Sequence, residues 1–164
     1  MNVLDNVQVQ QKIKRVAIEI LEYNFDEKEI ILLGMNNNGY TLAELLKAEM
    51  ALIYPNPISI RRITLDPKYP NKEEAIIEEG VQNLKGKVII IIDDVANTGR
   101  SLFYAFKPLL NILPKRVQVM VLVNRKHKSF PVKVDYMGLE LATTVKEHIK
   151  VDIKNKGNYS VDLE

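Results

Sequence analysis

Two aspartates and a short polar loop form the stretch of this sequence whose residue types are best suited to chemistry. Asp93 and Asp94 end an apolar run, and Thr98, Gly99 and Ser101 follow shortly after them. Hydroxyl groups and exposed backbone N–H groups suit a phosphate, because they can donate several hydrogen bonds to its oxygens. Carboxylates accept hydrogen bonds from sugar hydroxyls and hold Mg²⁺ directly or through water. These residue types predict a sugar-phosphate site, with Asp93 and Asp94 as metal ligands.

The elements around this loop place it between the end of a strand and the start of a helix. Residues 88–92 are all apolar and β-branched, which is typical of a parallel strand covered on both faces. Residues 102–110 carry apolar side chains at helical spacing. A helix start favours an anion, because its first N–H groups lack intrahelical partners. The alternative is that Thr98 only caps the helix and that the aspartates are solvated residues at a strand end.

A second strand–loop–helix unit precedes the first. Residues 30–33 are a short apolar run, Gly34 ends it, and residues 41–50 have helical periodicity. Two such loops at the carboxyl edge of one parallel sheet face a shared crevice, where open α/β sheets bind ligands. The alternative is an ordinary turn bounded by glycines. The residues of this loop are Asn36, Asn37, Asn38 and Gly39.

The stretch over residues 89–101 resembles the phosphoribosyl-pyrophosphate (PRPP) motif of type I phosphoribosyltransferases. It consists of four apolar residues, two acids, a variable triplet and then T-G-x-S. Residues 63–65, 121–131 and 135–138 are similar, in the same order, to segments of the pyrimidine-operon attenuator proteins that also act as uracil phosphoribosyltransferases. The similarity covers most of the chain.

The resemblance implies a fold and a reaction. The fold is α/β, a mainly parallel sheet with helices on both faces, and we expect a small hood region from the strands after Pro131. The reaction is transfer of the 5-phosphoribosyl group from PRPP to a nitrogenous base, a pyrimidine such as uracil being favoured, with Mg²⁺ as cofactor and release of pyrophosphate. The loop at residues 36–39 would bind pyrophosphate. The catalytic residues would be Asp93, Asp94 and Asn97, and the 5-phosphate would be bound by Ala96, Asn97, Thr98, Gly99, Arg100 and Ser101.

The sequence departs from the family pattern at two places. The pyrophosphate loop of the attenuator proteins contains Lys and Arg, whereas the asparagines here offer uncharged amide donors. Charge-assisted hydrogen bonds are roughly twice as strong as neutral ones, so we expect weaker pyrophosphate binding and slow turnover. Asn97 stands where purine-using relatives have an Asp that handles a purine proton. Because an amide cannot act as a general base, Asn97 argues against a purine substrate.

A basic loop at residues 124–130 has two functional interpretations. The first is contact with the base, for which Arg125 and Met137 are the predicted residues. The second is RNA binding by a regulator of pyrimidine genes, which the attenuator resemblance implies and which Lys12, Arg15, Arg125, Lys126 and Lys128 would support if they form one binding face. A separate possibility is a relative whose crevice binds a nucleotide without turnover. A solvated loop is the remaining alternative.

The rest of the chain is expected to complete the sheet. Residues 9–21 predict an amphipathic helix, and residues 58–65 a strand with a bulge at Arg61 and Arg62. The polar residues 66–87 resemble the mobile loop that closes over PRPP in the family, with a short helix at 74–79; solvated surface is the alternative. Further strands are predicted at residues 117–123, 132–137 and 148–153, and an edge strand at 154–164.

Length and composition favour a single domain over residues 1–164 and exclude several chemistries. The chain has no cysteine, which excludes thiolate catalysis, thiolate metal sites and disulfides. No ATPase or dinucleotide glycine motif is present, and His127 and His148 lack the spacing of a zinc protease. A net charge of +2 demands no polyanionic partner. With no signal segment or bilayer-spanning run, we expect a cytoplasmic homodimer or higher oligomer without a membrane partner.

Overall fold

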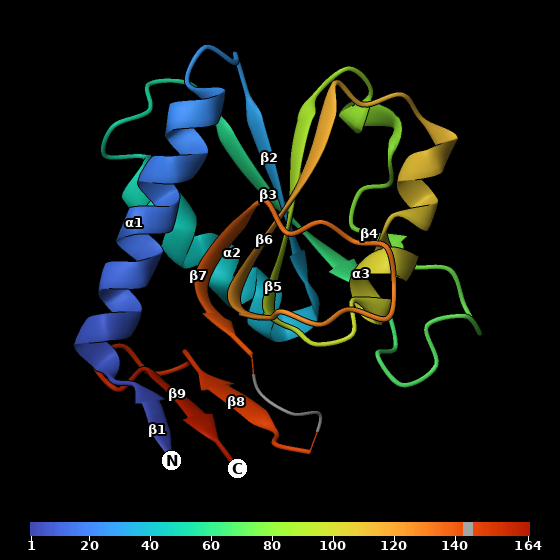
Figure 1. Ribbon diagram of the computed structural model, residues 1–164. Coiled ribbons are helices and arrows are strands. Elements are labelled where there is room, and N and C mark those ends of the chain that lie inside the picture. Colours follow the sequence, from blue (N-terminus) through green and yellow to red (C-terminus); the bar gives the residue numbers. More distant parts are fainter. Residues whose placement is uncertain (143–145) are drawn as a thin grey trace.

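A computed structural model describes residues 1–142 and 146–164. It contains a six-stranded sheet of order β4-β3-β2-β5-β6-β7 (Figure 1). Every neighbouring pair is parallel except β3 and β4, which are antiparallel at one edge. The strands of this sheet are β2 (Ile30–Met35), β3 (Ile58–Thr64), β4 (Ile76–Ile77), β5 (Val88–Ala96), β6 (Arg116–Arg125) and β7 (Tyr136–Leu141).

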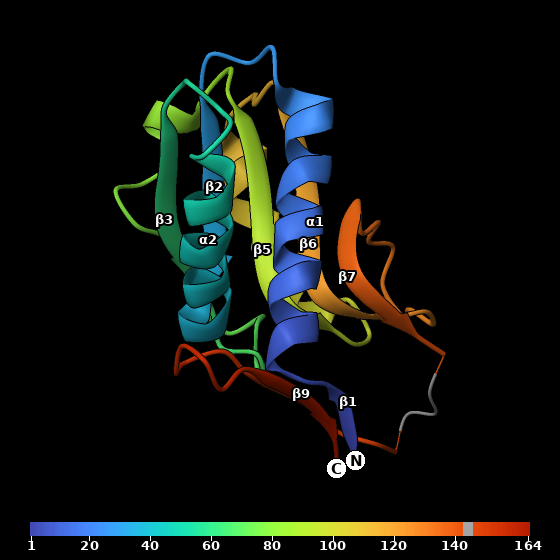
Figure 2. The same ribbon diagram turned by 90° about the vertical axis from the view of Figure 1, so that its left-hand side faces the viewer.

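Helices cover both faces of this sheet. On one face lie α1 (Asn6–Asn24) and α2 (Asn36–Met50), which stand in front of the sheet in Figure 2. The opposite face is covered by α3 (Arg100–Ala105). The structure also contains two short 3₁₀ helices, η1 (Gln82–Leu84) and η2 (Lys107–Asn111). The core is divided accordingly. Ile90 and Ile92 belong to the cluster that includes α1 and α2, and Ile89 and Ile91 belong to the cluster that includes α3. The predicted α/β architecture is confirmed, and β5 is buried on both faces as expected.

The predicted hood has a different composition. It is an antiparallel sheet of order β1-β9-β8 that joins both ends of the chain (Figure 1). The N-terminal strand β1 (Asn2–Leu4) was not predicted, and β9 (Ser160–Leu163) is the central strand rather than an edge, flanked on its other side by β8 (Ile149–Asp152). β7 belongs to the large sheet, because it pairs with β6 from Met120↔Tyr136 onward.

Three local predictions are wrong. Residues 36–39 form the first turn of α2 instead of a loop, because Asn36 has a φ of 52° and the chain passes directly from β2 into the helix. Arg61 and Arg62 form no bulge, since β3 pairs with β2 without a shift in register. Arg61 instead takes an inward position and donates a hydrogen bond to the Gly80 carbonyl at 3.3 Å. The predicted helix at 74–79 is replaced by β4, whose buried Ile77 pairs with Ile63.

Element lengths also differ from the prediction. β5 continues through both aspartates to Ala96, so that the acids are strand residues. The helix predicted at 102–110 is divided into α3 and η2, and Pro108 lies in the first turn of η2, where its missing N–H costs nothing. α1 begins earlier than predicted, because Asp5 and Gln8 form a capping box. No helix within residues 1–142 and 146–164 is long and apolar enough to cross a membrane.

Candidate active site

The two aspartates lie at the carboxyl end of β5 and serve opposite faces of the sheet. Successive residues of a strand point to alternate sides, so Asp93 follows the side of Ile91 and Asp94 the side of Ile92. Asp94 is accordingly close to α2, and its Oδ2 accepts a hydrogen bond from the Asn38 amide at 2.8 Å. Asp93 lines a cavity next to α3. Each carboxylate therefore faces a different half of the crevice.

Burial raises the pKa of the Asp93 carboxyl well above its ordinary value. The neighbouring charge of Asp94 adds to this increase, and a hydrogen bond from the Asp94 N–H to Asp93 Oδ1 at 2.9 Å opposes it. A carboxylate in such surroundings is stabilised by hydroxyl donors or a cation. Perturbed groups of this kind in a crevice are typical of functional sites.

The predicted 5-phosphate residues surround one cavity of about 350 Å³. Gly99 precedes α3 with a φ of 84°, a left-handed conformation that favours glycine. Hydrogen bonds to residues of another loop hold this segment in place: the Thr98 carbonyl accepts hydrogen bonds from the N–H groups of Ser129 and Phe130 at 3.0 and 3.1 Å. All six predicted residues contribute to the lining, which consists of Pro67, Asp93, Val95, Ala96, Asn97, Thr98, Gly99, Arg100, Ser101 and Leu102.

The segment after β3 reaches this cavity. Arg100 Nη2 donates a hydrogen bond to the Pro67 carbonyl at 2.8 Å. Pro67 itself belongs to the cavity lining. Beyond it, the Lys72 ammonium lies 4.3 Å from the centroid of the Tyr69 ring. Residues 66–87 therefore begin at the cavity lined by residues 96–101, and their closing over PRPP stays a prediction.

The predicted pyrophosphate segment is the start of α2. Asn36 Oδ1 accepts the Leu65 N–H at 3.1 Å, and Asn38 holds Asp94, so these two amides have structural partners. Asn37 is exposed. Gly39 is buried and packs so closely against β5 that a Cβ atom at this position would overlap the Ile92 carbonyl oxygen. Close packing of α2 on the sheet accounts for this glycine.

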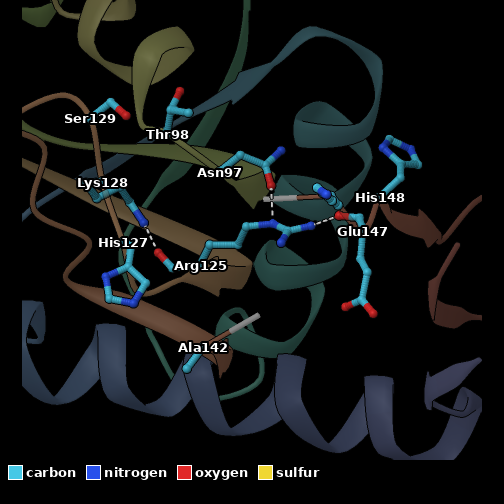
Figure 3. A pocket seen from close by; sticks show the side chains of 10 residues that line it. Asn97, Thr98, Arg125, His127, Lys128, Ser129, Ala142, Glu147 and His148 are labelled. Atoms are coloured by element: carbon cyan, nitrogen blue, oxygen red, sulfur yellow. Dashed lines mark hydrogen bonds between the residues drawn. The ribbon is translucent and has the colours of Figure 1, made fainter. Parts of the chain in front are cut away.

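A second cavity of about 580 Å³ shares Asn97 and Thr98 with the first one. Figure 3 shows the side chains that line it. Asn97 Oδ1 accepts a hydrogen bond from Arg125 Nε at 2.7 Å, and an Arg125 Nη donates to the Glu147 carbonyl next to β8. Arg125 is 8% exposed. The cavity thus joins the end of β5, the basic loop and the hood; its lining is Asn97, Thr98, Arg125, His127, Lys128, Ser129, Ala142, Lys146, Glu147 and His148.

Met137, the second predicted base contact, is not part of this lining. It lies on β7 and packs against the core cluster of α3. Lys128, in contrast to Met137, lines the cavity. Its ammonium donates to Asn124 Oδ1 at 2.7 Å and to the Arg125 carbonyl, and burial lowers the pKa of Lys128. Arg125 is thus the predicted base contact that lines the cavity.

The five basic residues proposed for RNA do not form one open face. Arg125 and Lys128 turn into the cavity, as described above (Figure 3). Arg15 pairs with Glu19 and donates to the Gly138 carbonyl at 2.7 Å. Lys126 is exposed and Lys12 half-buried. Arg125 and Lys128 are thus turned away from an open basic face, and RNA binding by the exposed members of the set stays a prediction.

A parallel α/β sheet with a phosphate cavity and a second subsite around one central strand end defines a phosphoribosyltransferase-type protein. Residues 1–156 match the family described as the phosphoribosyl transferase domain. The chain belongs to this family, and the predicted resemblance is confirmed. Its activity class is that of a phosphoribosyltransferase.

Similar proteins agree with this assignment. The bifunctional protein PyrR of Haemophilus ducreyi is 32% identical over 163 residues, covering 91% of this chain and 87% of the relative. The bifunctional protein PyrR of Streptococcus pyogenes is 31% identical, with 92% and 88% covered. Among solved structures, a hypoxanthine-guanine phosphoribosyltransferase of Bacillus anthracis has a TM-score of 0.78 at 18% identity, with 99% and 97% covered. The hypoxanthine phosphoribosyltransferase of Trypanosoma cruzi has a TM-score of 0.79 at 13% identity, with 99% and 95% covered. At these identities the two structures support the fold alone.

Proposed function

We propose that this protein transfers the 5-phosphoribosyl group of PRPP to a pyrimidine base such as uracil and releases pyrophosphate. The observation that carries this proposal is the junction at Asn97. This residue lines both the 5-phosphate cavity and the cavity next to β6. A ribose bound between the two would present its anomeric carbon at their boundary. The second cavity is therefore the site for the base.

Positioning and electrostatics account for the reaction. The bond from the anomeric carbon to pyrophosphate breaks and its electron pair leaves with pyrophosphate, while positive charge develops on the ribose. A base nitrogen then bonds to that carbon, and its N–H proton passes to solvent or to the released pyrophosphate. Asp93 and Asp94 would accept hydrogen bonds from ribose hydroxyls and stabilise this charge. The 5-phosphate would be held by residues 96–101. Fixing both reactants in one orientation contributes a large part of the rate.

The orientation of Asn97 favours a base with carbonyl groups. Arginine is only a donor, so the Asn97 atom that accepts from Arg125 at 2.7 Å is the amide oxygen. The Asn97 NH₂ group is therefore available to donate to the base. A pyrimidine carbonyl oxygen is a suitable acceptor. Because the amide cannot remove a proton, a purine that needs a general base is a poorer substrate.

Mg²⁺ fits the donor set at the end of β5. This ion usually keeps several waters and binds through one or two carboxylates and substrate phosphates. Asp93 and Asp94 supply such carboxylates. Within residues 1–142 and 146–164 no cluster of three or more potential ligands forms a metal cage. When bound with PRPP, the ion would neutralise charge on the pyrophosphate.

The test is pyrophosphate release from PRPP and Mg²⁺ with a panel of bases. We expect release with uracil and little with hypoxanthine, guanine or adenine. A preference for a purine would overturn the assignment of the base. If no base leads to pyrophosphate release, the proposed catalytic activity is contradicted. Calorimetry with PRPP would then test the alternative, a protein that binds nucleotides without catalysis.

A second candidate is an RNA-binding regulator of pyrimidine genes that uses the crevice as a nucleotide sensor. The word "bifunctional" in the names of the PyrR relatives favours it. The inward positions of Arg125 and Lys128 count against it. RNA affinity that falls steeply with salt in fluorescence anisotropy would support this candidate. No binding at low salt would exclude it.

The assembly and location belong to the same proposal. The chain would act as a single domain in a cytoplasmic homodimer or higher oligomer with a role in pyrimidine salvage. Light scattering coupled to size-exclusion chromatography would measure the mass. A monomeric mass at working concentrations would contradict this part of the proposal.

A further inference from the structure

The pyrophosphate subsite of the proposed reaction has no positive charge in its own segment. Residues 36–39 contain three asparagines and a glycine. The Asn36 and Asn38 side chains are also occupied, by the Leu65 N–H and by Asp94. Pyrophosphate carries several negative charges, and charge-assisted hydrogen bonds are the strong ones. A cation from another element would compensate for the uncharged segment.

Arg62 reaches this segment from the neighbouring strand. In the parallel register of β2 and β3, Gly34 pairs with Arg62. Paired residues of neighbouring strands point to the same face. Gly34 has no side chain, and Arg62 extends toward the start of α2. Its Nε donates to the Asn36 carbonyl at 3.3 Å, and its guanidinium carbon lies 4.3 Å from the centroid of the Tyr40 ring.

The guanidinium of Arg62 has hydrogen-bonding capacity left for a ligand. It is half-buried, and stacking on Tyr40 restricts its orientation. Within residues 1–142 and 146–164, its Nη atoms donate to no protein acceptor, and it forms no ion pair with a carboxylate. Arginine binds phosphate oxygens through two parallel N–H groups. Its Nη edge is suited to this contact.

We propose that Arg62 supplies the positive charge of the pyrophosphate subsite and binds pyrophosphate oxygens of PRPP. This assignment rests on the phosphoribosyltransferase function proposed above. The Arg62 guanidinium on β3 would provide the positive charge that residues 36–39 lack. The corresponding prediction is selective: Arg62 matters for ligands that carry pyrophosphate and not for a nucleoside monophosphate, whose only phosphate occupies the cavity at residues 96–101.

Calorimetry on Arg62→Gln with two probes, inorganic pyrophosphate with Mg²⁺ and uridine 5-monophosphate, tests this selectivity. We expect pyrophosphate to bind at least about tenfold more weakly and the monophosphate to change less than about twofold. Arg62→Lys should recover part of the loss. Lys47→Gln, which removes the same charge from an exposed position on α2, should leave both affinities unchanged.

The outcomes separate this inference from the proposed function. If wild type binds neither probe, the proposed function fails and the Arg62 assignment fails with it. If wild type binds both, equal changes or no change in Arg62→Gln overturn the Arg62 assignment alone.

A measurement on wild type covers the case in which the variants do not fold. Phenylglyoxal modifies accessible arginines, and tandem mass spectrometry resolves Arg62 from Arg61. Pyrophosphate with Mg²⁺ should slow modification of Arg62, and the monophosphate should not. Equal rates with and without pyrophosphate would overturn the assignment.

Discussion

Gly39→Ala tests whether close packing of α2 on β5 determines the geometry of the site. A Cβ atom at position 39 would lie closer than 3.0 Å to the Ile92 carbonyl oxygen. An ordinary C···O contact is about 3.3–3.6 Å. The start of α2 must therefore move away from β5 by several tenths of an ångström or more. The same movement carries Asn38 away from Asp94.

The expected cost follows from two opposing contributions. Overpacking of this kind costs about 1–3 kcal/mol. Alanine is better than glycine in a helix by about 0.5–1 kcal/mol. The net loss in unfolding free energy should be about 1–2 kcal/mol, which lowers Tm by roughly 2–8 °C for a chain of this size. Displacement of a catalytic segment by about 1 Å can reduce the rate about a hundredfold.

The assay combines thermal unfolding with pyrophosphate release. Lys47→Ala, an exposed change in the same helix, is the control and should alter Tm by less than about 1 °C. An unchanged Tm in Gly39→Ala would refute the packing argument. Lost activity with an unchanged Tm would instead assign Gly39 to direct contact with the ligand.

Three further predictions concern the crevice. Asp93→Asn should raise Tm at pH 7, because the charged carboxylate is partly desolvated and destabilises the native state there. The pKa of Asp93 is raised in the folded protein, so the stability that this group contributes below its ordinary pKa of 3.8 is lost as pH rises. The Tm advantage of the variant should therefore shrink as pH falls toward 4. Thr98→Val should weaken the binding of a nucleoside 5-monophosphate by about 1–3 kcal/mol, measured by calorimetry, and leave the binding of the unphosphorylated nucleoside unchanged. Asn38→Ala removes the amide that holds Asp94, so kcat for PRPP should fall about tenfold or more while Tm changes by no more than about 4 °C; unchanged kcat would contradict a role for that contact.

The cavity at residues 96–101 was predictable because these lining residues are contiguous. An unbroken β-branched run marks β5 as buried on both faces, and the polar loop follows it directly. The proposed pyrophosphate subsite depends instead on contacts between residues that are distant in the sequence. Arg62 reaches the start of α2 only because β2 and β3 pair in a register that sets it beside Gly34. No spacing along the sequence encodes that register.

Local propensity was misleading where tertiary pairing decides the structure. Residues 74–79 are rich in good helix formers, yet Ile77 gains more by pairing with Ile63 and entering the core. Asparagines at 36–38 suggest a loop, yet the left-handed backbone of Asn36 allows α2 to begin at once. β1 has only three residues and forms because β9 lies beside it. A strand so short has no pattern to detect.

The pairing of the two aspartates has a physical reason that the motif alone does not provide. Adjacent residues in a strand point to opposite faces, so two consecutive acids at a strand end cannot both serve the same face. Asp93 faces the cavity before α3, and Asp94 faces Asn38 at the start of α2. A ribose lying across the end of β5 would meet a carboxylate on each side, one toward the 5-phosphate and one toward the pyrophosphate. If the proposed ribose position is right, the extension of β5 to Ala96 has a function, because a strand that ended at Ile92 would provide no backbone alternation to divide the two acids between the two subsites.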